Sequence, residues 1–214
     1  MIDILTRFKT VTFPFKYQGT QGHAPSQANS DGEQWLVADR TNIDLFFGAD
    51  RSRHRPFIRF WKAGCLGLFM VRDGNWIFCG WSGMPGSRFP SYLPQNILKR
   101  GGYWTFGVHT REEFRGKGYY KQGMLRLAHL IQQRDPEGTV YSDTNPSNAA
   151  VRHALPSIGF KPCGVIITYK LWVPRVGHWA LWGKWLRNEP HPSGITLPTL
   201  SNPTGESPLK HKEP

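Results

Sequence analysis

The chain has 214 residues, of which 39% are hydrophobic, a content that suits one globular domain with extensions. Its 27 Lys and Arg residues outnumber its 15 Asp and Glu residues, so the formal net charge is +12 and the surface must carry an excess of cations. No apolar run approaches the length of a membrane span, and residues 1–19 lack the continuous apolar region of a secretory signal. The eight histidines and three cysteines show no metal-ligand spacing, which argues against a metal site. We therefore expect a cytoplasmic protein that holds no metal.

The first half of the chain is predicted to contain a β-hairpin. Residues 66–72 and 75–81 are rich in apolar and β-branched or aromatic side chains, and Asp73-Gly74 between them is typical of a tight hairpin turn. Three elements are expected before it: a strand within residues 3–18, a polar loop over residues 19–31, and a helix within residues 33–47.

A cluster of cations precedes this hairpin. It consists of Arg51, Arg53, Arg55, Arg59 and Lys62, with His54 among them. Such a run is often just a solvated surface. The functional alternatives are a coenzyme A phosphate, an acidic acyl carrier protein, an acidic polysaccharide or nucleic acid.

A basic, glycine-containing turn follows the next predicted strand. Residues 103–110 read as an extended segment, and Arg115-Gly116-Lys117-Gly118 lies between it and an amphipathic helix. The apolar face of that helix is formed by Tyr120, Met124, Leu127, Ala128 and Ile131. Glycines allow the backbone N–H groups to converge on an anion, and the helix N-terminus adds a partial positive charge. The turn therefore predicts a phosphate or pyrophosphate site.

A second strand–turn–helix unit follows about thirty residues later. Residues 140–143 read as a short buried strand, and the turn Thr144–Asn148 leads into a helix. This helix ends at Gly159-Phe160-Lys161, after which residues 165–171 form a further predicted strand.

This order of motifs resembles the central half of the GNAT N-acetyltransferase superfamily, over roughly residues 103–172. The resemblance implies an α/β fold of one domain, with a central mixed sheet flanked by helices, and acetyl-CoA as the acyl donor. It places the donor pyrophosphate at Arg115, Gly116, Lys117 and Gly118, and the pantetheine arm at Asn148. The backbone near Val108 and Thr110, together with Tyr119 and Tyr120, completes the expected cofactor site.

Three positions depart from the pattern of the superfamily. Tyr120 stands where the phosphate motif ends in Gly or Ala, and a similar aromatic residue occurs in relatives linked to polysaccharide or amino-sugar modification. Leu155 stands where many members carry a tyrosine general acid, so it cannot protonate a leaving thiolate. Pro156 follows it and is expected to stop or kink the helix.

Acyl transfer to an amine needs a base for the proton of the acceptor. His109 is the first choice, because its pKa lies near neutrality and it sits on the strand beside the phosphate turn. Glu113, with Glu112, is the next candidate, although an acidic pair can simply solvate the turn. Tyr141 is the candidate general acid, with a core aromatic role as its alternative.

The acceptor pocket varies most within the superfamily, so its residues are predicted from position alone. Trp81, Trp104 and Asp143 are expected to line it, the tryptophans as a wall for a sugar ring and Asp143 as a partner for an amine. The preferred function is an acetyl-CoA-dependent N-acyltransferase acting on a small-molecule or saccharide amine. Two alternatives stay open: a long-chain N-acyltransferase that uses an acyl carrier protein, and a nucleic-acid-binding or nucleic-acid-modifying protein.

The character of the chain changes after residue 175. We expect an acyltransferase domain over residues 1–175, a Trp-rich basic segment over 176–187 and a disordered Pro-rich tail over 188–214. Trp179, Trp182 and Leu186 have the spacing of one helix face. This segment either packs on the domain or meets a membrane interface or an acyl chain.

Overall fold

The computed structural model describes residues 7–19, 32–173 and 177–187, and in them nine strands form one mixed sheet. The strand order is β2-β3-β4-β5-β6-β1-β8-β9, and β7 pairs with β1. The strands are β1 (Arg7–Tyr17), β2 (Glu33–Val37), β3 (Leu66–Arg72), β4 (Asn75–Gly83), β5 (Tyr103–Thr110), β6 (Val140–Thr144), β7 (Phe160–Pro162), β8 (Val165–Val173) and β9 (Gly177–Leu186). The helices are α1 (Arg40–Phe47), α2 (Arg51–Lys62), α3 (Gln95–Leu98), α4 (Tyr119–Arg134) and α5 (Ala149–Ala154).

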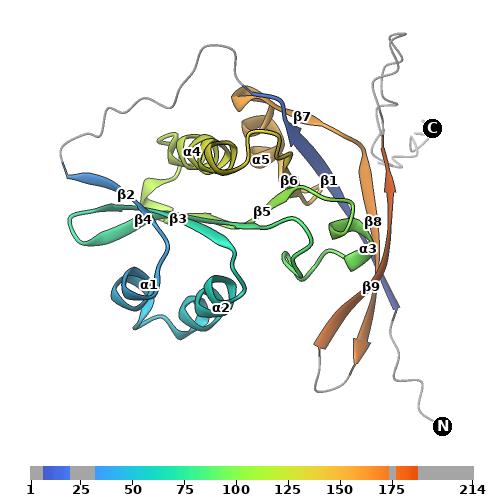
Figure 1. Cartoon of the computed structure of the whole chain (residues 1–214), viewed down its shortest axis with the longest axis horizontal. Helices are drawn as coiled ribbons and strands as arrows, with labels where there is room; N and C mark the ends of the chain where they lie inside the picture. The colour runs from blue at the N-terminus through green and yellow to red at the C-terminus, as the bar shows by residue number, and fades with distance from the viewer. Residues whose placement is uncertain (1–6, 20–31, 174–176, 188–214) are drawn as a thin grey trace, which may run out of the picture.

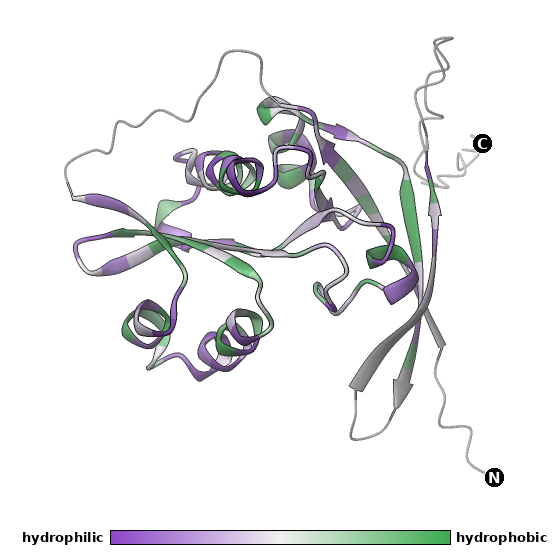
Figure 2. Cartoon of the chain, viewed as in Figure 1, coloured by the Kyte–Doolittle hydropathy of each residue, from purple (hydrophilic) through white to green (hydrophobic). Residues whose placement is uncertain are grey.

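Helices cover both faces of the sheet (Figure 1). The pair α1 and α2 lies below strands β2 to β5, α4 lies above them, and α3 packs beside β9. Figure 2 shows apolar and polar residues mixed along α1, α2 and α4, as expected of helices with one face on the sheet. Close contact of α4 with β4 depends on Gly123, because a Cβ there would lie 2.3 Å from the ring of Phe78.

The two halves of the sheet meet at one short parallel ladder. β5 and β6 pair only at Tyr103–Val140, Trp104–Tyr141 and Thr105–Ser142. Beyond these pairs, β5 continues along β4 to Thr110, and β6 continues along β1 to Thr144. In β5, Gly107 and Val108 lie opposite the single residue Gly80, and Gly107 has a φ of 58°. This bulge bends β5, and the two strands part.

Most predicted elements are confirmed. The hairpin around Asp73-Gly74 is β3 and β4, the helix after the basic turn is α4, and the fold class is the expected mixed α/β sheet. As predicted, the helix α5 ends before Pro156, which begins a short 3-10 turn.

The helix expected within residues 33–47 is α1, while the strand β2 and the helices α2 and α3 were not foreseen. The Trp-rich segment, whose spacing is that of one helix face, is instead the strand β9, because it pairs with β8 along its whole length. The cation cluster at residues 51–62 forms the helix α2, capped at its N-terminus by Asp50. The proposed tail over residues 188–214 lies outside the described residues.

A buried polar group fixes the start of α4 on the sheet. The Tyr119 hydroxyl donates to the Glu33 carboxylate at 2.9 Å and accepts from the Arg72 guanidinium at 2.8 Å. Glu33 and Arg72 also form an ion pair between β2 and β3, and Glu33 is only 8% exposed. Tyr119, the first residue of α4, thereby ties this helix to the edge of the sheet.

We expect Tyr119→Phe to lower the free energy of unfolding by about 1–3 kcal/mol, because it removes hydrogen bonds to buried charged groups. Urea unfolding measures this change. Tyr169→Phe is the matched control, since Tyr169 is 43% exposed and stacks on Trp182. Equal stability of the two variants would contradict the anchoring role of Tyr119.

Candidate active site

The turn between β5 and α4 leaves backbone N–H groups open to an anion. Gly116 and Gly118 have φ values of 75° and 84°, and an added Cβ would meet nothing within 4 Å at either residue. Glycine is therefore needed there for its left-handed backbone and not for space. Gly118 is the N-cap of α4 without a side-chain cap, and the first intrahelical bond runs from Gln122 N–H to the Gly118 carbonyl. The N–H groups of residues 119–121 lie before that bond and have no intrahelical acceptor.

Two cations flank these N–H groups on an exposed surface. Arg115 donates from Nε to the Thr110 carbonyl at 3.4 Å, and its guanidinium lies 3.6 Å from the Glu112 carboxylate. The Lys117 ammonium lies 5.2 Å from the centre of the Phe114 ring. Because these contacts are weak and exposed, both cations remain available to an anion at the turn.

A carboxylate lies at the other end of the gap between β5 and β6. Asp143 follows the last parallel pair on β6, and its side chain is half-buried. The Tyr92 hydroxyl, from the loop after β4, donates to Asp143 Oδ1 at 2.7 Å. Tyr120, at the start of α4, is close enough for the Asp143 charge to act on its hydroxyl. We call Asp143, Tyr92 and Tyr120 the acidic cluster.

Burial gives Asp143 the properties of a base near neutral pH. Burial raises the pKa of Asp143 from its usual value near 3.8 to about 6, against the opposing effects of the Tyr92 hydrogen bond and the Lys170 charge. Burial and the Asp143 charge raise the pKa of both Tyr92 and Tyr120, so these hydroxyls stay protonated. At pH 7 the cluster therefore holds one ionised carboxylate beside two neutral hydroxyls.

Contacts on both sides hold the loop that carries Tyr92. Before it, Phe89 stacks on Phe106 of β5 with ring centres 6.0 Å apart. After it, Asn96 of α3 makes two hydrogen bonds to the backbone of Gly183 on β9, at 2.6 and 3.1 Å. Tyr92 is thus held over Asp143 from two directions, although 37% of its surface is exposed.

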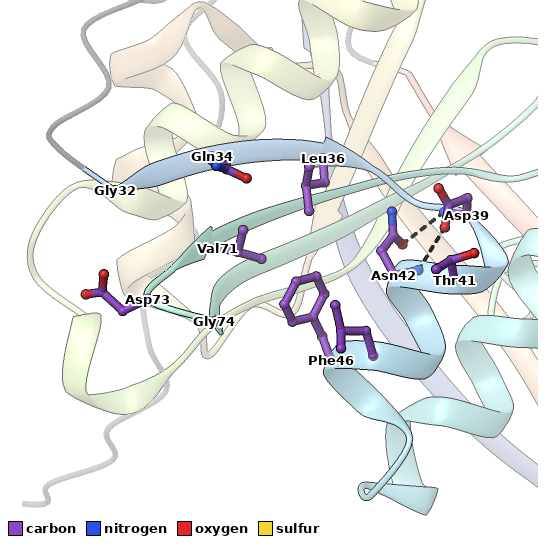
Figure 3. A pocket seen from close by; sticks show the side chains of 11 residues that line it. Gly32, Gln34, Leu36, Asp39, Thr41, Asn42, Phe46, Val71, Asp73 and Gly74 are labelled. Atoms are coloured by element: carbon purple, nitrogen blue, oxygen red, sulfur yellow. Dashed lines mark hydrogen bonds between the residues drawn. The ribbon is translucent and has the colours of Figure 1, made fainter.

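A cavity lies in another part of the molecule. It has a volume of about 610 Å³ and opens between β2, β3 and α1, where Leu36, Val71 and Phe46 form its apolar wall (Figure 3). No residue of the phosphate turn or of the acidic cluster lines this cavity. Among the residues that the structure describes, no helix is long and apolar enough to cross a membrane, and no group of His, Cys, Asp and Glu could hold a metal ion.

Comparison with solved structures identifies the architecture. The chain superposes on a Novosphingobium aromaticivorans protein assigned to the acetyltransferases of the GNAT family, with a TM-score of 0.55 and 14% identity over 79% of this chain and 67% of the other. It also superposes on a GCN5-related N-acetyltransferase-like protein from Streptococcus suis, with a TM-score of 0.52 and 16% identity over 79% of this chain and 63% of the other. The chain has the GNAT fold. It spans about two thirds of the length of these two structures. No protein-family model and no curated protein matches the sequence.

Within this GNAT fold, two of the residues expected to line the acceptor pocket belong to the core. Trp81 is fully buried in the aromatic cluster under α2, and Trp104 is 1% exposed between Tyr141 and Trp185. Neither offers a surface to an acceptor, which corrects the expectation of an aromatic pocket wall. Asp143 alone of the three predicted residues lies at the opening between the strands.

The three residues predicted to be catalytic lie in different parts of the molecule. His109 lies on β5, and partial burial of its ring, together with the charges of Arg53 and Arg115, lowers its pKa. Glu113 is an exposed ion-pair partner of Arg111 at 2.5 Å. Tyr141 is half-buried and stacks on Trp104 with ring centres 5.0 Å apart. No contact among the described residues joins any of these three side chains to the acidic cluster.

The predicted cofactor residues mostly lie around the turn. Val108 and Thr110 are on the part of β5 that has left β6, and Tyr120 belongs to the acidic cluster. The Tyr119 side chain instead points to Glu33, so only its backbone N–H is available at the turn. Asn148 caps α5, its Oδ1 accepting from Val151 N–H at 3.2 Å, and its side chain is exposed.

Tyr92 was not predicted from the sequence. Its partner Asp143 is 51 residues away in the chain. The loop after β4 that carries Tyr92 has no periodic sequence pattern. No local signal identifies such a contact.

The raised pKa of Asp143 predicts a pH-dependent cost to stability. Between pH about 4 and about 6 the folded protein retains a proton that the unfolded chain has lost, so the free energy of unfolding should fall as pH rises through this range. Asp143→Asn lacks this titration. We therefore expect the melting temperature of the variant, relative to wild type, to increase from pH 4 to pH 6 and then level off. A constant difference across this range would contradict a raised Asp143 pKa.

Proposed function

We propose that the protein transfers an acyl group, acetyl in the simplest case, from a coenzyme A thioester to a primary amine on a small molecule or a saccharide. The observation that supports this most is the gap between β5 and β6, with a phosphate-binding turn at one end and the acidic cluster at the other. The turn would bind the phosphates of a coenzyme A donor. The acidic cluster would take the proton of the amine that attacks the thioester. The GNAT fold is consistent with this chemistry.

The turn and β5 would bind the donor. The N–H groups at residues 116–121 and the cations Arg115 and Lys117 would hold the pyrophosphate. The edge of β5 that has left β6 exposes backbone groups between Val108 and Thr110, which can pair with the amides of a pantetheine arm. One N–H of this edge would stabilise the negative charge that develops on the thioester oxygen. Asn148 would contribute its free amide hydrogens.

Asp143 would act as the base. The amine nitrogen attacks the carbonyl carbon, the carbon–sulfur bond breaks, and the proton lost by the nitrogen passes to the Asp143 carboxylate. A thiol pKa near ~8.5 makes the thiolate a good leaving group without a dedicated acid. Tyr92 orients the carboxylate through its hydrogen bond, and Tyr120 can donate to the departing sulfur.

Calorimetric titration with acetyl-CoA tests the donor site. We expect Arg115→Ala/Lys117→Ala to weaken binding at least about tenfold, which is 1.4 kcal/mol, through loss of two phosphate contacts. Arg134→Ala/Lys161→Ala removes the same charge from the far end of α4 and from β7, and should bind like wild type. The donor proposal fails if the folded wild-type protein does not bind acetyl-CoA.

Thiol release from acetyl-CoA, measured with a panel of primary amines that includes amino sugars, tests the base. Asp143→Asn should lower kcat by about 10²- to 10⁴-fold. In wild type, kcat/KM should fall as pH drops below about 6, the pKa of Asp143, because the protonated carboxyl is no longer a base.

His109→Gln and Glu113→Gln are the comparison variants for this test. Both should keep the turnover of wild type within a few-fold. Loss of activity in His109→Gln together with normal activity in Asp143→Asn would instead assign the base to His109.

A further inference from the structure

The solvent face of α2 carries a row of cations. Arg51, Arg55 and Arg59 follow one another at intervals of four residues and Lys62 comes three residues later, so all four lie on one side of the helix. All four are exposed. We call these residues the basic stripe. At 1.5 Å per residue it is about 16 Å long.

The acidic groups near the stripe are paired with other cations. Asp50 pairs with Arg53, and Asp44 pairs with Arg40 and His54. No ion pair among the described residues includes a member of the stripe. Like charges four residues apart repel one another, and Arg51 also opposes the positive end of the helix dipole, whereas Arg59 and Lys62 in the last turn match its negative end. An external anion would relieve the repulsion along the stripe.

Two classes of anionic partner fit the stripe poorly. A membrane surface would need an apolar helix face to insert, but Phe57 of α2 is buried in the aromatic cluster below the sheet. A protein partner would need an apolar interface centre, whereas the middle of the stripe is formed by Arg55 and Arg59. A linear polyanion needs neither feature.

The side chains of the stripe and their surroundings favour phosphodiesters with free bases. Three of the four cations are arginines, whose forked guanidinium groups match phosphate oxygens. At the C-terminal end, Arg59 lies 5.3 Å from the ring centre of Phe89, and Trp61 of the same helix is 37% exposed. An exposed ring on a helix that carries a row of cations suits a strand whose phosphates pair with arginines while a base stacks on an aromatic side chain.

We propose that the basic stripe binds single-stranded nucleic acid. The four cations of the stripe match about four phosphates of one strand. The inference goes beyond the proposed acyl transfer and does not depend on it, because it uses α2 and not the phosphate turn or the acidic cluster.

Fluorescence anisotropy with a labelled 20-nucleotide oligothymidine tests the proposal, with NaCl varied from about 50 to 300 mM. Four phosphate contacts on a single strand predict a slope of log K against log salt of about −3, at 0.7 per contact. Arg51→Gln/Arg55→Gln/Lys62→Gln should reduce the slope to about −0.7 and weaken binding at least tenfold at 100 mM salt.

The matched control is Arg134→Gln/Arg152→Gln/Lys161→Gln, which removes three exposed cations from α4, α5 and β7. It should keep the wild-type slope. The stripe variant should bind acetyl-CoA as wild type does, which shows that it is folded. Failure of acetyl-CoA binding would thus count against the proposed function and leave the stripe result intact.

Four outcomes would overturn the proposal. These are no binding of the oligonucleotide by wild type, an unchanged slope in the stripe variant, equal weakening in both triple variants, and equal or tighter binding of a 20-base-pair duplex. Labelled heparin provides one more comparison. Heparin binding that depends on the stripe, without binding of the oligonucleotide, would assign the surface to an acidic polysaccharide instead.

Discussion

The candidate site depends on the early separation of β5 from β6. Each strand keeps its partner on the outer side, β4 for β5 and β1 for β6, so each half of the sheet remains hydrogen-bonded while the ladder between the halves ends after Thr105 and Ser142. The bulge at Gly107 turns β5 away and exposes a strand edge inside the molecule. An exposed edge is normally a liability, and here it is a place within the sheet where an extended ligand can add hydrogen bonds.

The groups around this gap come from distant segments, and separate contacts hold each of them. The buried Tyr119–Glu33–Arg72 group fixes α4, and with it the phosphate turn. The Asn96–Gly183 pair fixes the loop that carries Tyr92. The proposed acyl transfer would gain much of its rate from holding donor and acceptor in line, and this requires both ends of the gap to be rigid at once. In that proposal, contacts far from the reacting atoms act as positioning contacts.

Local sequence patterns predicted what local forces determine. The turn at Asp73-Gly74, the apolar face of α4 and the stop at Pro156 each follow from a few neighbouring residues, and all are confirmed. The strand β9 was taken for a helix because Trp179, Trp182 and Leu186 have helical spacing, but pairing with β8 decides its conformation. The burial of Trp81 and the contact of Tyr92 with Asp143 likewise depend on packing between distant segments. Sequence therefore predicted the elements on either side of the basic turn, but not the contact between Tyr92 and Asp143.

The charges around Asp143 and His109 set the two groups apart chemically. Burial raises the pKa of Asp143, and Lys170 is the cation whose charge opposes this rise. His109 has two arginines acting on it and a lowered pKa, so it is a weaker base than a free histidine. If the arginines of α2 stood beside Asp143, their charge would hold the pKa of that carboxyl at or below its ordinary value and remove its basicity. Keeping the cations at the turn and on α2 leaves Asp143 ionised at pH 7 and still able to accept a proton.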